Sequence, residues 1–124
     1  MVNYLNVCFI RPGINGPRDI EKAFSEGFRM IKVTIPKKPY DDEEFFSLWE
    51  IAQNLKIPIL FHTGVVTLAK KVPEEKTLSW YMHPMRINHI ANAFPRLKII
   101  IAHLGVHWNN YAAELIRMKK NLKI

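Results

Sequence analysis

The chain has 124 residues, of which 48% are hydrophobic and 23% are charged, a composition typical of a folded globular domain. We therefore expect a single domain over residues 1–124. No apolar run approaches the roughly 20 residues of a membrane span, and the N-terminus lacks the pattern of a signal peptide. The sequence accordingly predicts a cytoplasmic protein with no membrane partner.

The formal net charge of +7 is compatible with a polyanionic partner. The lysines and arginines are scattered, however, with adjacent pairs only at 37–38, 70–71 and 119–120. No basic stripe interleaved with aromatic residues is present, so we predict no nucleic-acid partner. The single cysteine, Cys8, lies in an apolar run, and we expect a buried thiol without a catalytic role.

The first half of the chain alternates between strand and helix patterns. Apolar runs at residues 4–10 and 28–35 predict strands, and the second run is closed by Pro36. Between them, apolar residues at helical spacing predict a helix that begins near residue 19 and has Gly27 as its C-terminal cap. A second helix is predicted over residues 41–55, because acidic residues occupy its first turn and a broad apolar face follows.

The second half continues the alternation. Its predicted elements are a strand at 57–62, a mobile loop forming a lid at 64–77, a helix at 84–94, a strand at 98–103, a helix at 107–119 and the start of another strand at 121–124. Apolar strands that alternate with helices predict a parallel α/β sheet, with each strand buried on both faces. A doubly wound sheet and a (β/α)₈ barrel both remain open at this point, since no glycine-rich phosphate loop is present.

Two of the predicted strands end in the same way. One ends at His62, which is followed by Thr63 and Gly64, and the other ends at His103, which is followed by Leu104 and Gly105. The carboxyl ends of parallel strands meet at one edge of a sheet, so we expect the two histidines to share a site.

The runs at residues 27–32, 58–64 and 94–108 resemble the amidohydrolase-related metal-dependent hydrolases. These are (β/α)₈ barrels of the amidohydrolase superfamily, in the branch that includes aminocarboxymuconate semialdehyde decarboxylase. The resemblance implies four βα units, corresponding to the third through sixth barrel strands, and thus about half of a barrel. It also implies that His62 and His103 are metal ligands, that the cofactor is a divalent metal such as zinc, and that a small molecule is hydrolysed at a C–N or C–O bond or decarboxylated.

The chain departs from that family in two places. The first-strand His-x-His pair and the eighth-strand aspartate have no counterpart, and Glu114 is the sole acid after His103. Two histidines form an incomplete set, because a catalytic zinc normally keeps three protein ligands. We expect either a second copy or the remainder of a longer barrel to cover the strand edges. Two copies in one barrel would bring both histidine pairs around one mouth. The alternative is a catalytically inactive barrel fragment that acts only as a self-associating unit.

Other polar residues are weaker candidates. Lys32, near the end of the second strand, is predicted to contact an anionic group of the substrate or to serve as a structural ion-pair partner. Arg86 could reach a substrate carboxylate, with a solvated surface charge as the alternative. His83 and His89 are predicted to be surface or helix-capping residues.

Overall fold

The computed structural model describes residues 5–66 and 75–124, with side chains described at 5–66 and 78–124. The strands are β1 (Val7–Ile10), β2 (Met30–Val33), β3 (Ile59–His62), β4 (Ile99–Ala102) and β5 (Leu122–Lys123). The helices are α1 (Pro17–Ser25), α2 (Phe46–Asn54), α3 (Glu75–Tyr81), α4 (Pro84–Ala93) and α5 (Asn109–Met118), with short 3₁₀ turns η1 (Glu43–Phe45) and η2 (His103–Gly105).

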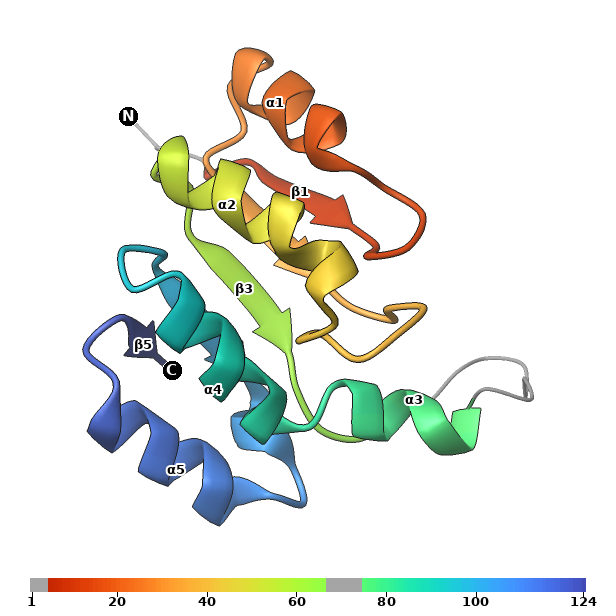
Figure 1. Cartoon of the computed structure of the whole chain (residues 1–124), viewed down its shortest axis with the longest axis vertical. Helices are drawn as coiled ribbons and strands as arrows, with labels where there is room; N and C mark the ends of the chain where they lie inside the picture. Colours follow the sequence, from red (N-terminus) through yellow and green to blue (C-terminus); the bar gives the residue numbers. More distant parts are fainter. Residues whose placement is uncertain (1–4, 67–74) are drawn as a thin grey trace.

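The five strands form one sheet in the order β1-β2-β3-β4-β5, and every neighbouring pair is parallel (Figure 1). Each strand reaches its neighbour through a helical crossover, the connection that a parallel pair requires. The predicted parallel α/β architecture is confirmed. The further strand predicted at 121–124 is confirmed as β5, which pairs with the start of β4.

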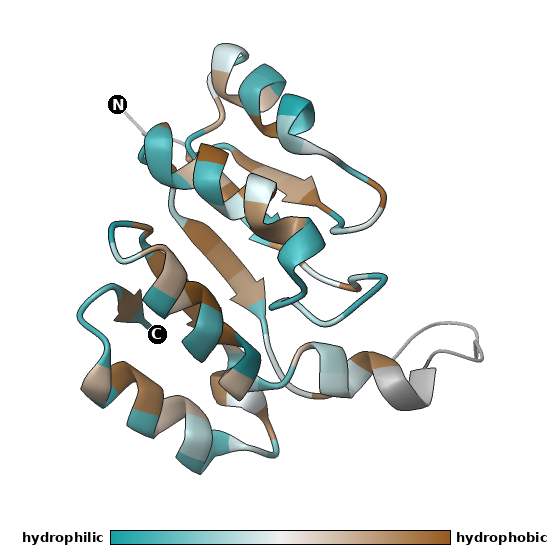
Figure 2. Ribbon diagram, in the orientation of Figure 1, coloured by the Kyte–Doolittle hydropathy of each residue, from teal (hydrophilic) through white to brown (hydrophobic). Residues whose placement is uncertain are grey.

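Helices α1, α2, α4 and α5 cover one face of the sheet, whereas α3 lies beyond the carboxyl end of β3, and the hydrophobic core lies between the helices and the strands (Figure 2). On β2, β3 and β4, alternate residues face this core and are 2% exposed or less, namely Ile31, Val33, Ile59, Phe61, Ile99 and Ile101. Trp49 of α2 packs on Phe61 with ring centres 5.0 Å apart, and each such fully buried side chain contributes about 1.5–3 kcal/mol.

The opposite face of the sheet is left open by the described residues. Phe9 of β1 is 66% exposed on it, and Leu60 and Ile100 are partly exposed. The prediction that each strand is buried on both faces is therefore wrong for this chain. The sequence did not reveal the difference because Phe9, Leu60 and Ile100 of the open face are also apolar, so β1, β3 and β4 lack the regular polar alternation that marks a solvated face.

Two predicted boundaries also differ from the structure. The strand predicted to reach residue 103 ends at Ala102, and His103 opens η2 instead. The loop predicted at 64–77 overlaps α3, which begins at Glu75. Residues 67–74, where the lid was predicted, lie outside the described residues. No helix in the described part of the chain is long and apolar enough to cross a membrane.

Candidate functional site

The two histidines that end the paired motifs lie side by side at the carboxyl ends of β3 and β4. His62 is the last residue of β3 and pairs in register with Ala102, so His103 follows one position beyond. The two imidazole ring centres are 4.8 Å apart, and the ring planes are inclined by 59°. The parallel register thus brings together residues that are 41 positions apart in the sequence, by 103 minus 62.

Lys32 shares the open face of the sheet with His62. Lys32 pairs in register with Leu60, and Leu60 and His62 lie on the same side of β3 because side chains alternate along a strand. The Lys32 ammonium also lies 5.5 Å from the ring centre of Phe9. The positive charge of Lys32 therefore lies on β2, the strand next to the one that carries His62.

The environment of His62 favours its neutral form. Burial of the ring, the neighbouring His103 and, to a smaller extent, Lys32 lower the pKa of His62 below its ordinary value, and a hydrogen bond with the Val65 backbone opposes them. Its Nε2 atom is buried and has no hydrogen-bond partner among the described residues. A buried polar atom without a partner is costly, and a neutral imidazole is the form that ligates a metal.

The backbone at His103 and at the residue after it is held in left-handed conformations. His103 has a φ of 66° and Leu104 a φ of 50°, which are uncommon for residues with a side chain. Such strain persists only where the surrounding structure fixes it, and it often occurs at functional sites. The strained segment here is the one that carries His103 toward His62.

The loops after β3 and β4 are joined to each other. The Val65 N–H donates to the Val106 carbonyl at 2.9 Å. A Cβ placed on Gly64, whose φ is 94°, would collide with that same carbonyl oxygen and lie 2.9 Å from the Gly105 carbonyl carbon. A Cβ on Gly105 would in turn collide with the ring of Pro84. The glycine after each histidine is therefore required by packing, which explains the repeated His-x-Gly pattern.

Two hydroxyl groups that sequence reasoning missed also fix the strand ends. The buried Tyr40 hydroxyl donates to the His62 carbonyl at 2.8 Å and to the Val33 carbonyl at 3.2 Å, and burial raises the pKa of Tyr40 well above its ordinary value. The buried Thr63 hydroxyl donates to the Ala102 carbonyl at 2.8 Å, joining β3 to β4. Thr63 stands inside the repeated motif, whereas Tyr40 lies in a polar turn that carries no sequence signal.

Arg86 does not join this cluster in the described residues. Its guanidinium lies 3.5 Å from the Asp41 carboxylate and donates to the Trp80 carbonyl at 3.4 Å. His89 also faces Asp41, at 3.9 Å. The structure thus places Arg86 in a separate polar group on α4, away from the pair formed by His62 and His103.

His83 caps α4, which confirms its predicted role. Its Nδ1 accepts a hydrogen bond from the Met85 N–H at 3.1 Å. The ring also packs against Trp80 and Trp108, with ring centres 5.5 and 4.5 Å away. Burial and the charge of Arg86 lower the pKa of His83. The helix cap and the ring packing together give His83 a structural role.

The donor set at the strand ends fits part of a metal site. His62 and His103 offer two imidazoles, and His62 has an unpartnered buried nitrogen. Within the described residues, no group of three or more histidine, cysteine, aspartate or glutamate side chains is gathered as a metal site would require. Imidazole pairs suit zinc and similar divalent ions, but a catalytic zinc takes three protein ligands. The remaining ligands would have to come from elsewhere.

Comparison with solved structures shows the same fold in larger proteins. An uncharacterized TIM-barrel protein from Bordetella bronchiseptica matches 95% of this chain and 41% of that chain, at 17% identity and a TM-score of 0.73. A protein from Staphylococcus aureus, provisionally described as an amidohydrolase, matches 87% of this chain and 44% of that chain, at 17% identity and a TM-score of 0.52. The chain spans less than half the length of either protein, and its βα units form about half of a TIM-type (β/α)₈ barrel.

The sequence comparison extends the likeness beyond the fold. A search of curated proteins gives no match. A family model described as Amidohydrolase matches residues 11–122, which include both histidine motifs. The match covers nearly the whole chain in a single span. The chain therefore belongs to the amidohydrolase family.

Proposed function

We propose that this chain provides part of the active site of a metal-dependent hydrolase, in which His62 and His103 are two ligands of a divalent metal, zinc in the first instance. The observation that carries the proposal is the pair itself, two imidazoles 4.8 Å apart with a buried, unpartnered Nε2 on His62. The lowered pKa of His62 keeps this ring neutral and able to bind a metal. Membership of the amidohydrolase family supports a hydrolytic reaction.

The reaction we propose is hydrolysis of a C–N or C–O bond, or decarboxylation in the branch that resembles aminocarboxymuconate semialdehyde decarboxylase. A bound divalent metal would lower the pKa of a water molecule toward ~7 or polarise a carbonyl group of the substrate. Lys32, on the same open face as His62, would hold an anionic group of a small-molecule substrate. Arg86 would do so only after leaving Asp41, so we rank it below Lys32.

We further propose that additional barrel strands cover the open face of the sheet and supply the missing ligands. Closure of the barrel would turn that face into the barrel interior, and apolar residues on it, such as the exposed Phe9, are suited to burial there. A second copy that paired its β1 with β4 would have to displace β5, because Leu122 and Lys123 already pair with Ile99 and Ile100. The pairing of β5 with β4 therefore favours the remainder of a longer barrel as the part that closes the sheet. It argues against closure by a second copy that contributes four strands.

Elemental analysis of the purified chain after equilibration with zinc and removal of free metal tests the proposal. We expect bound zinc in the unaltered chain, a loss in both His62→Ala and His103→Ala, and no loss in the control His89→Ala. His89 is a matched control because it is also a partly exposed histidine, but it lies beside Asp41 instead of at the strand ends. Zinc that is unaffected by either substitution would contradict the proposal and leave the inactive barrel fragment as the better account.

A further inference from the structure

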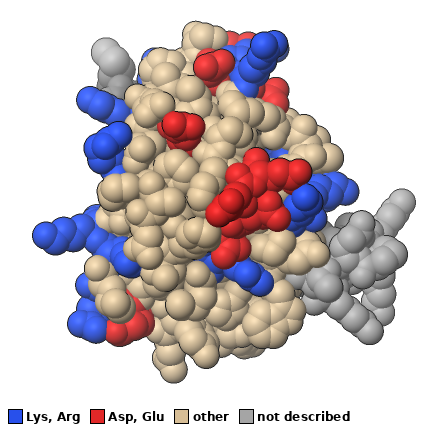
Figure 3. All heavy atoms as spheres, in the orientation of Figure 1, with Lys and Arg blue, Asp and Glu red and all other residues tan. Residues whose placement is uncertain are grey.

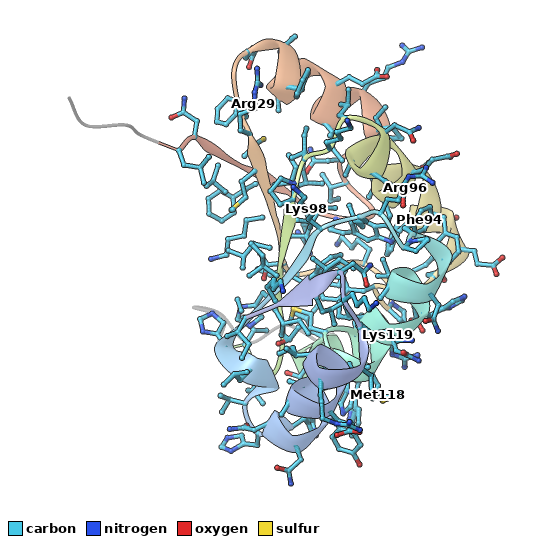
Figure 4. The ribbon with its side chains drawn as sticks, turned by 90° about the vertical axis from the view of Figure 1, so that its left-hand side faces the viewer. Arg29, Phe94, Arg96, Lys98, Met118 and Lys119 are labelled. Atoms are coloured by element: carbon cyan, nitrogen blue, oxygen red, sulfur yellow. The ribbon has the colours of Figure 1, made fainter. Side chains whose placement is uncertain are left out.

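The opposite edge of the sheet, where the strands begin, carries a concentration of positive charge that the sequence does not reveal. All strands are parallel, so the turns that precede them lie along one edge. The cationic residues in these turns are Arg29 before β2, Lys56 before β3, Arg96 and Lys98 before β4, and Lys119 and Lys120 before β5. Figure 3 shows lysine and arginine side chains along the left margin, which is this edge, and Figure 4 views it directly.

At the middle of this edge, a hollow of about 170 Å³ lies between the end of α2 and the turn that precedes β4. Its lining combines two apolar residues at the base with four polar ones, namely Ala52, Ile57, Gln53, Lys56, Arg96 and Lys98. The three cations come from two separate turns. The fold therefore gathers around one hollow three positive charges that are as much as 42 residues apart, by 98 minus 56.

The polar groups around the hollow are free to receive a ligand. None of the three cations forms an ion pair with an acidic residue among those that the structure describes. The Gln53 side-chain oxygen accepts a hydrogen bond from the backbone N–H of Arg96 at 3.0 Å. That bond fixes the amide and leaves its NH₂ group as a hydrogen-bond donor. An ammonium, a guanidinium and an amide NH₂ are the groups that bind phosphate oxygens.

Lys56 occupies a position where glycine is the usual residue. The Ile57 N–H donates to the Ala52 carbonyl and the Lys56 N–H to the Gln53 carbonyl, the two hydrogen bonds of a Schellman motif at the end of α2. Lys56 has the left-handed φ of 57° that the motif requires. A glycine would adopt it without strain. The lysine side chain is thus held at the hollow at some expense of stability.

We propose that this hollow binds the phosphate group of a small molecule, either free inorganic phosphate or a phosphate ester. Phosphate matches the charge of Lys56, Arg96 and Lys98 and the donor of Gln53. None of the six lining residues is aromatic, so stacking of nucleic-acid bases is not provided there. The proposed site lies at the edge opposite to His62 and His103 and does not depend on metal binding.

Titration of the ¹⁵N-labelled chain with inorganic phosphate at constant ionic strength, followed by NMR, tests the proposal. We expect saturable shifts of the Gln53 side-chain NH₂ and of the backbone amides at residues 56, 96 and 98. The double variant Arg96→Gln/Lys98→Gln should weaken binding about tenfold or more, because it removes two charged hydrogen-bond donors from the hollow. The matched control Lys119→Gln/Lys120→Gln removes the same charge from the same edge and should leave binding unchanged.

Lys56→Gly separates binding from folding, because it should raise the midpoint of thermal unfolding while weakening phosphate binding. Tighter binding of glycerol 3-phosphate than of inorganic phosphate would assign the site to an ester, and the reverse order would assign it to the free ion. Shifts that never saturate, or an equal loss in the Lys119/Lys120 control, would overturn the proposal. A short RNA that binds more tightly and is weakened equally by both double variants would overturn it too, in favour of an extended polyanion surface.

Discussion

Replacement of Gly64 by alanine tests whether the loops after β3 and β4 are packed against each other as the structure shows. Gly64 has a φ of 94°, and its missing side chain faces the Val106 carbonyl. Gly27 is a matched control, since it has a φ of 96° but no atom lies within 4 Å of the place that a Cβ would take there. Both substitutions impose the same backbone strain on alanine, so the difference between them isolates the contact with the neighbouring loop.

The left-handed backbone costs an alanine about 1–2 kcal/mol, of which roughly 0.4–1 kcal/mol is offset because alanine restricts the unfolded chain. We therefore expect Gly27→Ala to lower the free energy of unfolding by about 1 kcal/mol. Overpacking adds about 1–3 kcal/mol, because the obstacle is backbone and cannot rotate away. Gly64→Ala should thus lose about 3 kcal/mol in total. Urea unfolding followed by circular dichroism measures both values, and equal losses in the two variants would refute the packing of these loops.

Two further predictions concern the two histidines with lowered pKa values and the Tyr40 hydroxyl. The pKa values of His62 and His83 are lower in the folded chain than the value of about 6.5 in the unfolded chain. At a pH between the folded and unfolded pKa values, the unfolded chain therefore binds more protons than the folded chain. Stability should therefore fall as pH is lowered through this window, and His62→Gln and His83→Gln should each flatten the fall in thermal melts; an unchanged slope would contradict the assignment. Tyr40→Phe should lower the free energy of unfolding by about 1–3 kcal/mol, because it removes a buried donor from two carbonyl groups. The control Tyr111→Phe, at a residue 52% exposed, should change it little, and equal losses in urea would count against the role of Tyr40.

The sequence predicted the parallel α/β arrangement because its strands are short apolar runs separated by helices with clear start and stop residues. It also predicted the meeting of His62 and His103, since their motifs occupy equivalent places at the ends of two strands. It did not reveal that one sheet face is open. Leu60 and Ile100 on that face are as apolar as the buried Ile59 and Ile99 on the other, so no alternation marks the difference.

Contacts between distant segments account for what the sequence could not supply. The role of Tyr40 depends on carbonyl groups at Val33 and His62, which only the folded sheet places within reach of its hydroxyl. The basic hollow has the same origin, because Lys56 and Lys98 stand far apart in a sequence whose charges look evenly spread. In both cases the spatial relation comes from strand register, which local residue patterns do not encode.

The most direct test of the proposed metal site follows the imidazole nitrogens of the ¹⁵N-labelled chain by NMR while zinc is added. We expect Nε2 of His62 and one ring nitrogen of His103 to shift together as one zinc ion binds per chain, while the nitrogens of His83 stay in place. Each shift should disappear when the other histidine is replaced by alanine. Zinc-dependent shifts at His83 or His89 with no change at His62 would contradict the account.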